Sequence, residues 1–288
     1  MPESDKKIKH FVWSRFFTYQ RKTYPYNVLD VDFLSKQLPL AKNMFSSMEN
    51  QTNQNFELLF LSNPKFFEDP KYEFIFSTLR SFTSLPITFI RGRGDVVKAE
   101  SNSELLQVLK GALNNYDFVI TTSMDFDDFI FKGAVEDTQS KVNECDNVLA
   151  YGYNKGYTYI YGELYRRNCT FWKDQGHDSM FRSLILKSSA VKNMPCFCVE
   201  NFHHNYIKPE MMKFFKDNGI EFTESMFQQN FSTDAFIYFR HDFSQEHLAV
   251  KGGKPYNVKG LTKLTTEDIT KEQLADEFGF HCELKSIK

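Results

Sequence analysis

Three carboxylates stand close together in residues 125–128 (DFDD), directly after an apolar segment at residues 117–122. One residue separates Asp125 from Asp127, so on an extended strand end their side chains would share a face. Neighbouring carboxylates repel one another, and exposure to water, protonation or a bound cation relieves this repulsion. A hard cation, Mn²⁺ or Mg²⁺, suits such oxygen ligands and also binds substrate phosphates. The cluster therefore predicts a metal site, with a solvated acidic turn as the alternative.

The segments before this cluster alternate between strand-like and helix-like patterns. Short apolar runs predict strands, and apolar residues at helical spacing predict helices. This alternation favours a mostly parallel central sheet flanked by helices in a single α/β domain, in which ligands bind at the carboxyl ends of the strands. The predicted strands are residues 10–17, 56–61, 85–90 and 117–122, and the predicted helices are residues 33–50, 72–81 and 103–113.

The second half of the sequence is less regular. Residues 148–161 predict a β-hairpin that turns around Asn154-Lys155-Gly156. The remaining predicted elements are strands at residues 183–188 and 235–240 and helices at residues 209–218 and 267–278.

Composition narrows the class of protein. The chain has 288 residues, of which 41% are hydrophobic, and a formal net charge of -2. It can therefore bury a core, and its charge gives no reason to expect nucleic acid as a partner. The five cysteines are too few and too scattered for a disulfide framework. Residues 1–10 are polar, and no apolar run is long enough for a transmembrane segment, so a soluble cytoplasmic protein is expected.

Five short motifs follow one another between residues 10 and 247. They are Arg15-Phe16, QTNQNF at residues 51–56, MDFDD at residues 124–128, FRSL at residues 181–184 and IYFRH at residues 237–241. In this order they resemble glycosyltransferases of the GT-A fold and, more narrowly, the rhamnosyltransferase family. The resemblance implies a Rossmann-like GT-A domain that takes a sugar from a nucleoside diphosphate sugar donor and passes it, most simply with inversion, to a glycan or other hydroxyl acceptor.

The resemblance also suggests donor-side and metal-binding residues. GT-A enzymes often add a C-terminal histidine to the metal ligands, which here would join His241 to Asp125 and Asp127; a surface histidine is the alternative. Arg15 would lie beside the donor's base or diphosphate, or else form a surface ion pair. Arg93 belongs to the glycine-rich turn at residues 91–94, which either binds an anion through its backbone amides or only reverses the chain.

An inverting transfer needs a general base that accepts the proton of the acceptor hydroxyl. The resemblance places the search after the acceptor-side strand, where Glu200 is the first choice; Asp178, in the polar loop at residues 173–178, is the second. A polar helix start is the alternative for either.

The expected organisation has a nucleotide-sugar-binding half at residues 1–130, an acceptor-binding half at residues 131–250 and a peripheral tail at residues 251–288. Two other functions remain open. A sugar nucleotidyltransferase would also use an α/β sheet and Mg²⁺, but would typically open with a glycine-rich loop where this chain has SRFF at residues 14–17. A catalytically inactive glycan-binding protein would not need the acidic pair.

Overall fold

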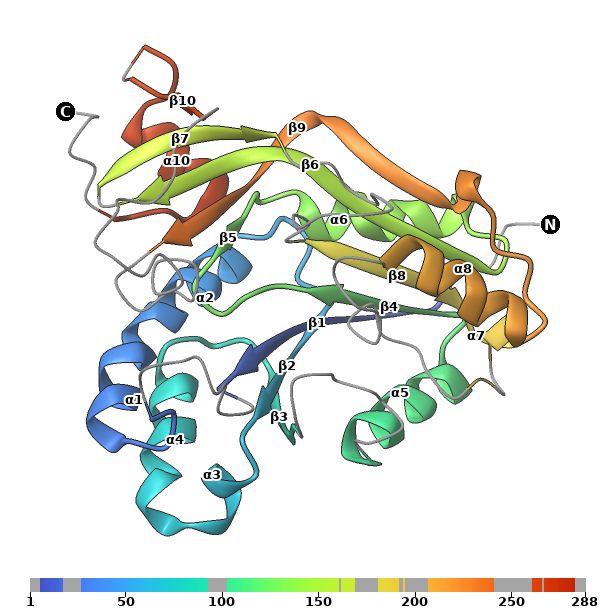
Figure 1. Cartoon of the computed structure of the whole chain (residues 1–288), viewed down its shortest axis with the longest axis horizontal. Coiled ribbons are helices and arrows are strands. Elements are labelled where there is room, and N and C mark those ends of the chain that lie inside the picture. Colours follow the sequence, from blue (N-terminus) through green and yellow to red (C-terminus); the bar gives the residue numbers. More distant parts are fainter. Residues whose placement is uncertain are drawn as a thin grey trace.

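Figure 1 shows the computed structural model of the chain, in which a long central sheet is accompanied by helices. The structure describes residues 6–17, 27–92, 103–160, 162–168, 181–191, 194, 207–240, 261–265 and 267–282.

The first part of the sheet is parallel, with strand order β3-β2-β1-β4. These strands are β1 (Ile8–Phe16), β2 (Glu57–Ser62), β3 (Ile87–Arg91) and β4 (Phe118–Ser123). The helical segments between them are α1 (Val31–Gln37), η1 (Leu38–Leu40), α2 (Ala41–Glu49), α3 (Lys65–Glu68), η2 (Pro70–Tyr72), α4 (Glu73–Ser81) and α5 (Ser103–Asn115). The predicted strands are confirmed. The helix predicted at residues 33–50 is broken into α1, η1 and α2, because Pro39 has no backbone N–H to continue an α-helix.

The second part of the sheet is mixed. Its strands are β5 (Phe129–Ile130), β6 (Val148–Ile160), β7 (Glu163–Asn168), β8 (Arg182–Lys187), β9 (Phe227–Arg240) and β10 (Thr262–Lys263). Strand β8 joins β4 in antiparallel orientation, and the order continues β8-β6-β7-β10, while β9 pairs with β6 and β5. The helical segments here are α6 (Ala134–Ser140), η4 (Lys141–Glu144), α7 (Ser188–Val191), α8 (Ile207–Asp217), η6 (Glu224–Met226) and α10 (Lys271–Phe278).

The hairpin predicted at residues 148–161 is wrong. Strand β6 runs without a break through Gly156, pairing with β8 and then β7 on one side and with β9 on the other. The glycine has a different purpose from a turn, because a Cβ atom at residue 156 would overlap the carbonyl oxygen and ring of Phe236. The chain instead reverses between Ile160 and Glu163, where Gly162 has a φ of 90°.

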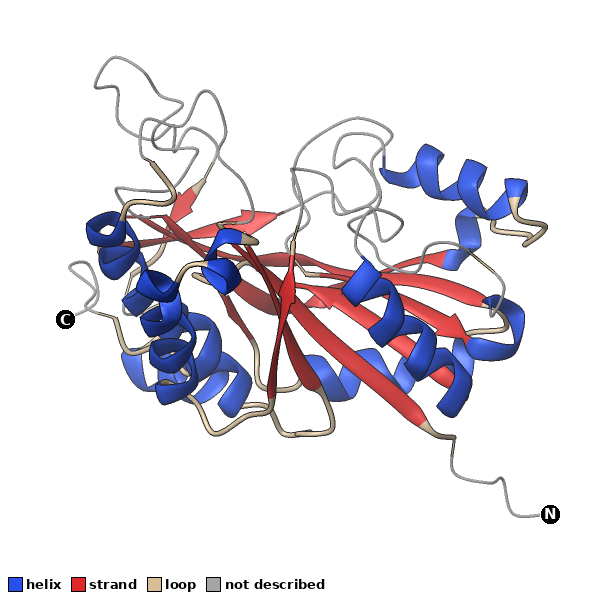
Figure 2. Ribbon diagram, turned by 90° about the horizontal axis from the view of Figure 1, so that it is seen from below, coloured by secondary structure: helices blue, strands red, loops and turns tan. Residues whose placement is uncertain are grey.

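Both faces of the sheet are covered, as Figure 2 shows with helices in blue on either side of the strands. Successive residues of β1 point to opposite faces of the sheet and belong to different hydrophobic clusters. Val12 belongs to the cluster that includes residues of α1, α2 and α4, whereas Trp13 belongs to the cluster that includes residues of α5 and α8. Strands buried on both faces read as continuous apolar runs, which is why β2 and β4 were visible in the sequence. The predicted single α/β domain, with helices flanking a central sheet, is confirmed. The sheet is mixed instead of mostly parallel, because β5, β7, β8 and β10 all pair in antiparallel orientation, whereas β9 pairs in parallel with β6.

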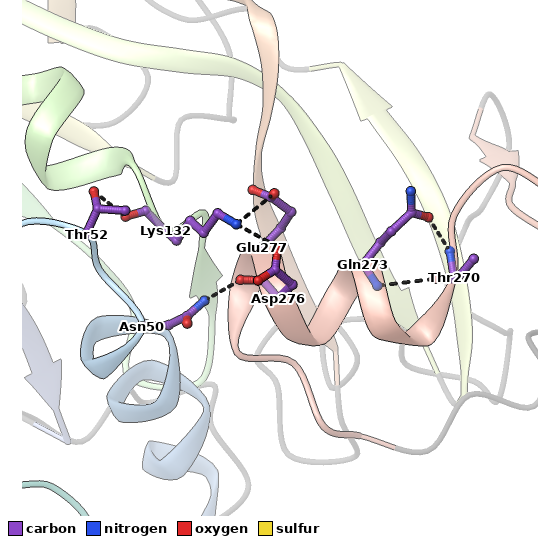
Figure 3. A network of polar contacts seen from close by, with 7 residues as sticks. All are labelled: Asn50, Thr52, Lys132, Thr270, Gln273, Asp276 and Glu277. Atoms are coloured by element: carbon purple, nitrogen blue, oxygen red, sulfur yellow. Dashed lines mark hydrogen bonds and ion pairs between the residues drawn. The ribbon is translucent and has the colours of Figure 1, made fainter.

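A third hydrophobic cluster joins the C-terminal segment to the sheet. Leu274 and Phe278 of α10 are buried with Phe129 of β5 and Ile237 of β9. Helix α10 begins with a capping box formed by Thr270 and Gln273, and its far end is tied to the first half of the chain (Figure 3). There the side chain of Asn50 donates to the carbonyl of Asp276 at 2.7 Å, and the Lys132 ammonium lies 2.6 Å from the Asp276 carboxylate. Segment 261–282 thus contributes to the core; the predicted division into donor half, acceptor half and tail stays a prediction.

The close approach at Gly156 gives a stability prediction. We expect Gly156→Ala to lower the free energy of unfolding by about 1–3 kcal/mol, because the added methyl group forces β9 away from β6. Gly111, exposed on α5 with open space where a Cβ atom would stand, is the matched control, and Gly111→Ala is expected to stabilise by about 0.5–1 kcal/mol. Urea unfolding of both variants measures the difference, and equal effects would contradict the assignment.

Candidate functional site

The acidic cluster forms a tight turn at the carboxyl end of β4. The N–H of Asp128 donates to the carbonyl of Asp125 at 3.3 Å, so these residues are not the extended strand end that the sequence predicted. Asp125 and Asp127 are partly exposed, whereas Asp128 is buried. That the first two side chains share one face stays a prediction. The turn presents two carboxylates to solvent at the edge of a parallel sheet, the edge where such sheets bind ligands.

The turn also packs against aromatic rings at the end of β1. The ring of Phe126 lies 5.2 Å from that of Phe16 and 5.7 Å from that of Phe17, between centroids. Phe17 has a φ of 48°, in the left-handed region that residues other than glycine rarely occupy. Backbone strain of this kind concentrates at functional sites. The end of β1 and the acidic turn therefore form one packed unit.

Hydrogen bonds fix the backbone of the turn at two further points. The N–H of Met124 donates to the carbonyl of Trp13 on β1 at 3.1 Å. The side-chain amide of Asn43, on α2, donates to the carbonyl of Asp127 at 3.0 Å. The turn is thus positioned by a strand on one side and by a helix on the other, through contacts to its backbone.

The structure brings Arg15 and Asp125 together. The guanidinium Nη2 lies 4.0 Å from Asp125 Oδ1, with the Arg15 side chain 23% exposed and that of Asp125 48% exposed. An ion pair this long and this accessible to water stabilises little. The structure thus shows the ion pair that was the alternative for Arg15, and the donor role of this residue stays a prediction.

Asp128 differs in kind from its neighbours. Its side chain is 1% exposed, and its Oδ1 accepts the N–H of Phe239, on β9, at 2.8 Å. Burial is the main cause that raises the pKa of Asp128 well above its ordinary value; the charges of Asp127 and Asp125 act in the same direction, and Arg240 opposes them. The three carboxyl groups are therefore two outward-facing ligand candidates and one inward-facing structural group.

At the end of β3, the two arginines of the predicted turn have different outcomes. The backbone N–H of Arg91 donates to Glu104 Oε2 at 2.9 Å, and its guanidinium pairs with the same carboxylate. The guanidinium also lies 4.8 Å from the ring centroid of Phe67. Arg91 thus joins β3 to α5, which favours the structural interpretation of this turn, whereas Arg93 lies outside the described residues.

Four predicted site residues lie outside the described part of the chain: Arg93, Asp178, Glu200 and His241. Their roles stay predictions. Within the described residues, no group of three or more histidine, cysteine, aspartate or glutamate side chains is arranged to hold a metal ion. The described donor set is the pair Asp125 and Asp127, whose oxygens are of the type that Mn²⁺ and Mg²⁺ accept, and a further ligand would have to come from substrate, water or residues such as His241.

A buried histidine near the site had no signal in the sequence. His10 lies on β1 beside a small cavity that Thr122, Met124, Ile130 and Phe181 also line. Its Nε2 is 2.8 Å from the Thr122 hydroxyl, which in turn is 2.7 Å from the hydroxyl of Ser183. Burial lowers the pKa of His10 to about 3, so the ring is neutral near pH 7 and cannot act there as an acid. In the structure, His10 links β1 to β4 through the Thr122 hydroxyl.

Comparisons with known proteins find distant likenesses of fold. No protein-family model matches the chain, and no curated protein sequence matches it either. Among solved structures, Staphylococcus aureus TarS is 11% identical with a TM-score of 0.39, covering 82% of this chain and 37% of that one. The chain thus spans well under half the length of TarS.

Two further solved structures match this chain over most of their own length. A Desulfovibrio desulfuricans G20 protein described as a nucleotide-diphospho-sugar transferase is 7% identical, with a TM-score of 0.40, covering 82% of this chain and 83% of that one. A Bacillus anthracis protein described as a glucose-1-phosphate thymidylyltransferase is 8% identical, with a TM-score of 0.39, covering 87% and 99%. These sequence identities and TM-scores are too low to carry a functional argument, so a function has to be argued from the chain's own residues.

Among the described helices, none combines the length and the apolar character that a bilayer crossing requires.

The buried His10 predicts a pH dependence of stability. Its pKa is lowered from about 6.5 in the unfolded chain to about 3 in the fold, so the unfolded state binds the proton more readily. Stability should therefore fall as the pH drops below 6.5, by about 1.4 kcal/mol per pH unit until about pH 3. Urea unfolding at pH 7 and pH 4.5 should show that His10→Gln loses about 2–3 kcal/mol less than the wild type over this interval.

The exposed His281 provides the control, since His281→Gln removes a histidine from the surface. A His10→Gln variant with the same pH dependence as the wild type would show that the ring is protonated in the folded protein.

Proposed function

We propose that this chain is a GT-A-type glycosyltransferase, in which Asp125 and Asp127 hold Mn²⁺ or Mg²⁺ against the diphosphate of a nucleoside diphosphate sugar. The observation that carries the proposal is the turn at the carboxyl end of β4, which presents two partly exposed carboxylates, that of Asp125 beside Arg15. Ligands of α/β sheets bind at this edge. The acceptor in this proposal is a glycan or another hydroxyl compound, and the donor sugar is left open.

The residues divide the chemistry between them. A divalent cation at this position supplies charge neutralisation for the departing diphosphate. Asp125 and Asp127 hold their carboxylates outward because the turn is fixed by Trp13 and Asn43. Arg15 offers a planar guanidinium that suits two phosphate oxygens at once. Preorganised charges of this type stabilise a transition state without reorganising during the reaction.

The proposal extends to residues outside the described part of the chain. His241, which follows Arg240 at the end of β9, is proposed as a further metal ligand, and Arg93 as a donor-binding residue. Glu200, or else Asp178, is proposed as the general base of an inverting transfer. These assignments depend on the resemblance and on the types of the residues.

A thermal-shift panel is the first experiment. Ligands that bind the native state raise its melting temperature by mass action. UDP-, GDP- and dTDP-sugars are tested with and without Mn²⁺, and a shift that needs both the sugar nucleotide and the metal supports the proposal. Donor binding without any transfer to a range of acceptors would favour the inactive glycan-binding protein, and release of pyrophosphate from a sugar phosphate and a nucleotide would favour the nucleotidyltransferase.

Asp127→Asn tests the metal assignment directly. The change removes one anionic ligand while keeping the shape of the side chain, so Mn²⁺-dependent donor binding should be lost and the melting temperature should stay close to that of the wild type. Calorimetry of donor binding in the presence of Mn²⁺ measures it. Asp146→Asn is the matched control, because Asp146 is exposed and lies shortly before β6, at the opposite end of the sheet. Wild-type affinity in the Asp127 variant would defeat the metal assignment.

The general base is tested by Glu200→Gln and Asp178→Asn on the same preparation. Removing the base should slow transfer by roughly 10²–10⁴-fold, while donor affinity is retained, because the metal and diphosphate contacts lie elsewhere. We expect this loss in Glu200→Gln. Transfer at the wild-type rate in that variant, with loss in Asp178→Asn, would move the assignment to Asp178.

A further inference from the structure

The buried Asp128 continues the pairing of two short strands with its side chain. Strand β5 begins at the next residue, and Phe129 and Ile130 pair with Ile237 and Phe236 of β9. One residue before this ladder, Asp128 Oδ1 accepts the N–H of Phe239 at 2.8 Å. A side-chain oxygen thus takes the role of a backbone carbonyl and joins the acidic turn to β9 where the ladder ends.

The second oxygen of the carboxyl group takes no part in this contact. Asp128 Oδ2 is buried and has no hydrogen-bond partner among the described residues. The chemistry that the fold uses at this position is one accepting oxygen, which an amide side chain also provides.

Asp128 completes the set of anchors around the turn. Trp13 holds its start through Met124, and Asn43 holds the carbonyl of Asp127. Asp128 holds the end of the turn from the side of β9. An inward-facing side chain at the last turn position keeps the two preceding carboxylates on the outer surface.

We propose that Asp128 is a positioning residue, which orients Asp125 and Asp127 toward the metal and donor by fixing the turn to the backbone of Phe239. This inference rests on the proposed function. In it, Asp128 does not contact the metal: the site has two protein carboxylates, and the third acts through the geometry of the other two.

Two substitutions separate positioning from ligation. Asp128→Asn keeps the accepting oxygen and removes the ionisable carboxyl group, whereas Asp128→Ala removes the anchor. Groups that orient metal ligands typically contribute 10–100-fold to metal affinity. We therefore expect the Mn²⁺ concentration for half-maximal donor binding to rise about 10–100-fold in Asp128→Ala and to stay within about twofold of the wild type in Asp128→Asn. Hydrogen exchange at the end of β9 is followed in parallel, and the Phe239 amide should lose protection in the alanine variant alone.

Ser47→Ala is the matched control for general loss of stability. The Ser47 hydroxyl accepts the N–H of Ile130 at 2.8 Å and donates to its carbonyl at 2.9 Å, so the change weakens β5 without touching the contact between Asp128 and Phe239. We expect it to lower the melting temperature and leave the Mn²⁺ titration unchanged.

The outcomes are distinct. If Asp128→Asn loses Mn²⁺-dependent binding as Asp127→Asn does, Asp128 is a ligand and the inference is overturned, even if the alanine variant does not fold. An effect of Ser47→Ala equal to that of Asp128→Ala would overturn it too, since stability alone would then explain the result. If the wild type binds donor in the presence of Mn²⁺ and Asp128→Ala has the same Mn²⁺ titration, the positioning role is wrong while the proposed function stands. A wild type without any metal-dependent binding defeats the proposed function, and the positioning role with it.

Discussion

Repulsion between neighbouring carboxylates is the constraint around which the candidate site is built. Three acidic residues within one turn cannot all be charged, exposed and close together without cost. The protein separates them by environment, with Asp125 and Asp127 partly exposed and Asp128 buried. The inner group stabilises the fold through a backbone N–H, and the outer two keep a concentrated negative charge at the edge of the sheet. This is the distribution of charge that the proposed metal site requires.

The surrounding elements serve this separation. Helix α2 supplies Asn43 to the turn, where its side-chain amide fixes the carbonyl of Asp127 directly before Asp128. The aromatic packing of Phe126 against Phe16 makes the end of β1 part of the same unit. The geometry of two carboxylates therefore depends on contacts with β1, α2 and β9, which come from widely separated parts of the sequence.

This separation also explains what the sequence could reveal. The four parallel strands and the place of the acidic cluster after one of them were predictable, because apolar runs and the position of DFDD are local patterns. The tight turn that the cluster forms was not, since the sequence predicted an extended strand end there. The burial of Asp128 was not, because its partner Phe239 lies 111 residues further along the chain. Local reasoning also failed at Gly156, because a glycine required for close approach of β9 and one required by a turn look the same in a sequence. The sequence singled out Arg15 for a donor role or an ion pair, but its contact with Asp125 became visible only in the fold.

The pairing of early and late segments has a consequence for how the chain reaches its fold. Asn50 contacts Asp276 across 226 positions of sequence, and Lys132 contacts the same residue across 144. Contacts between distant residues close large loops, and the entropy lost in closing them slows folding. During synthesis, the parallel strands leave the ribosome long before α10 does, and the apolar surface of β5 that α10 covers remains open in the meantime. We therefore expect the acidic turn to acquire its final shape late in folding, when the backbone of β9 donates to Asp128.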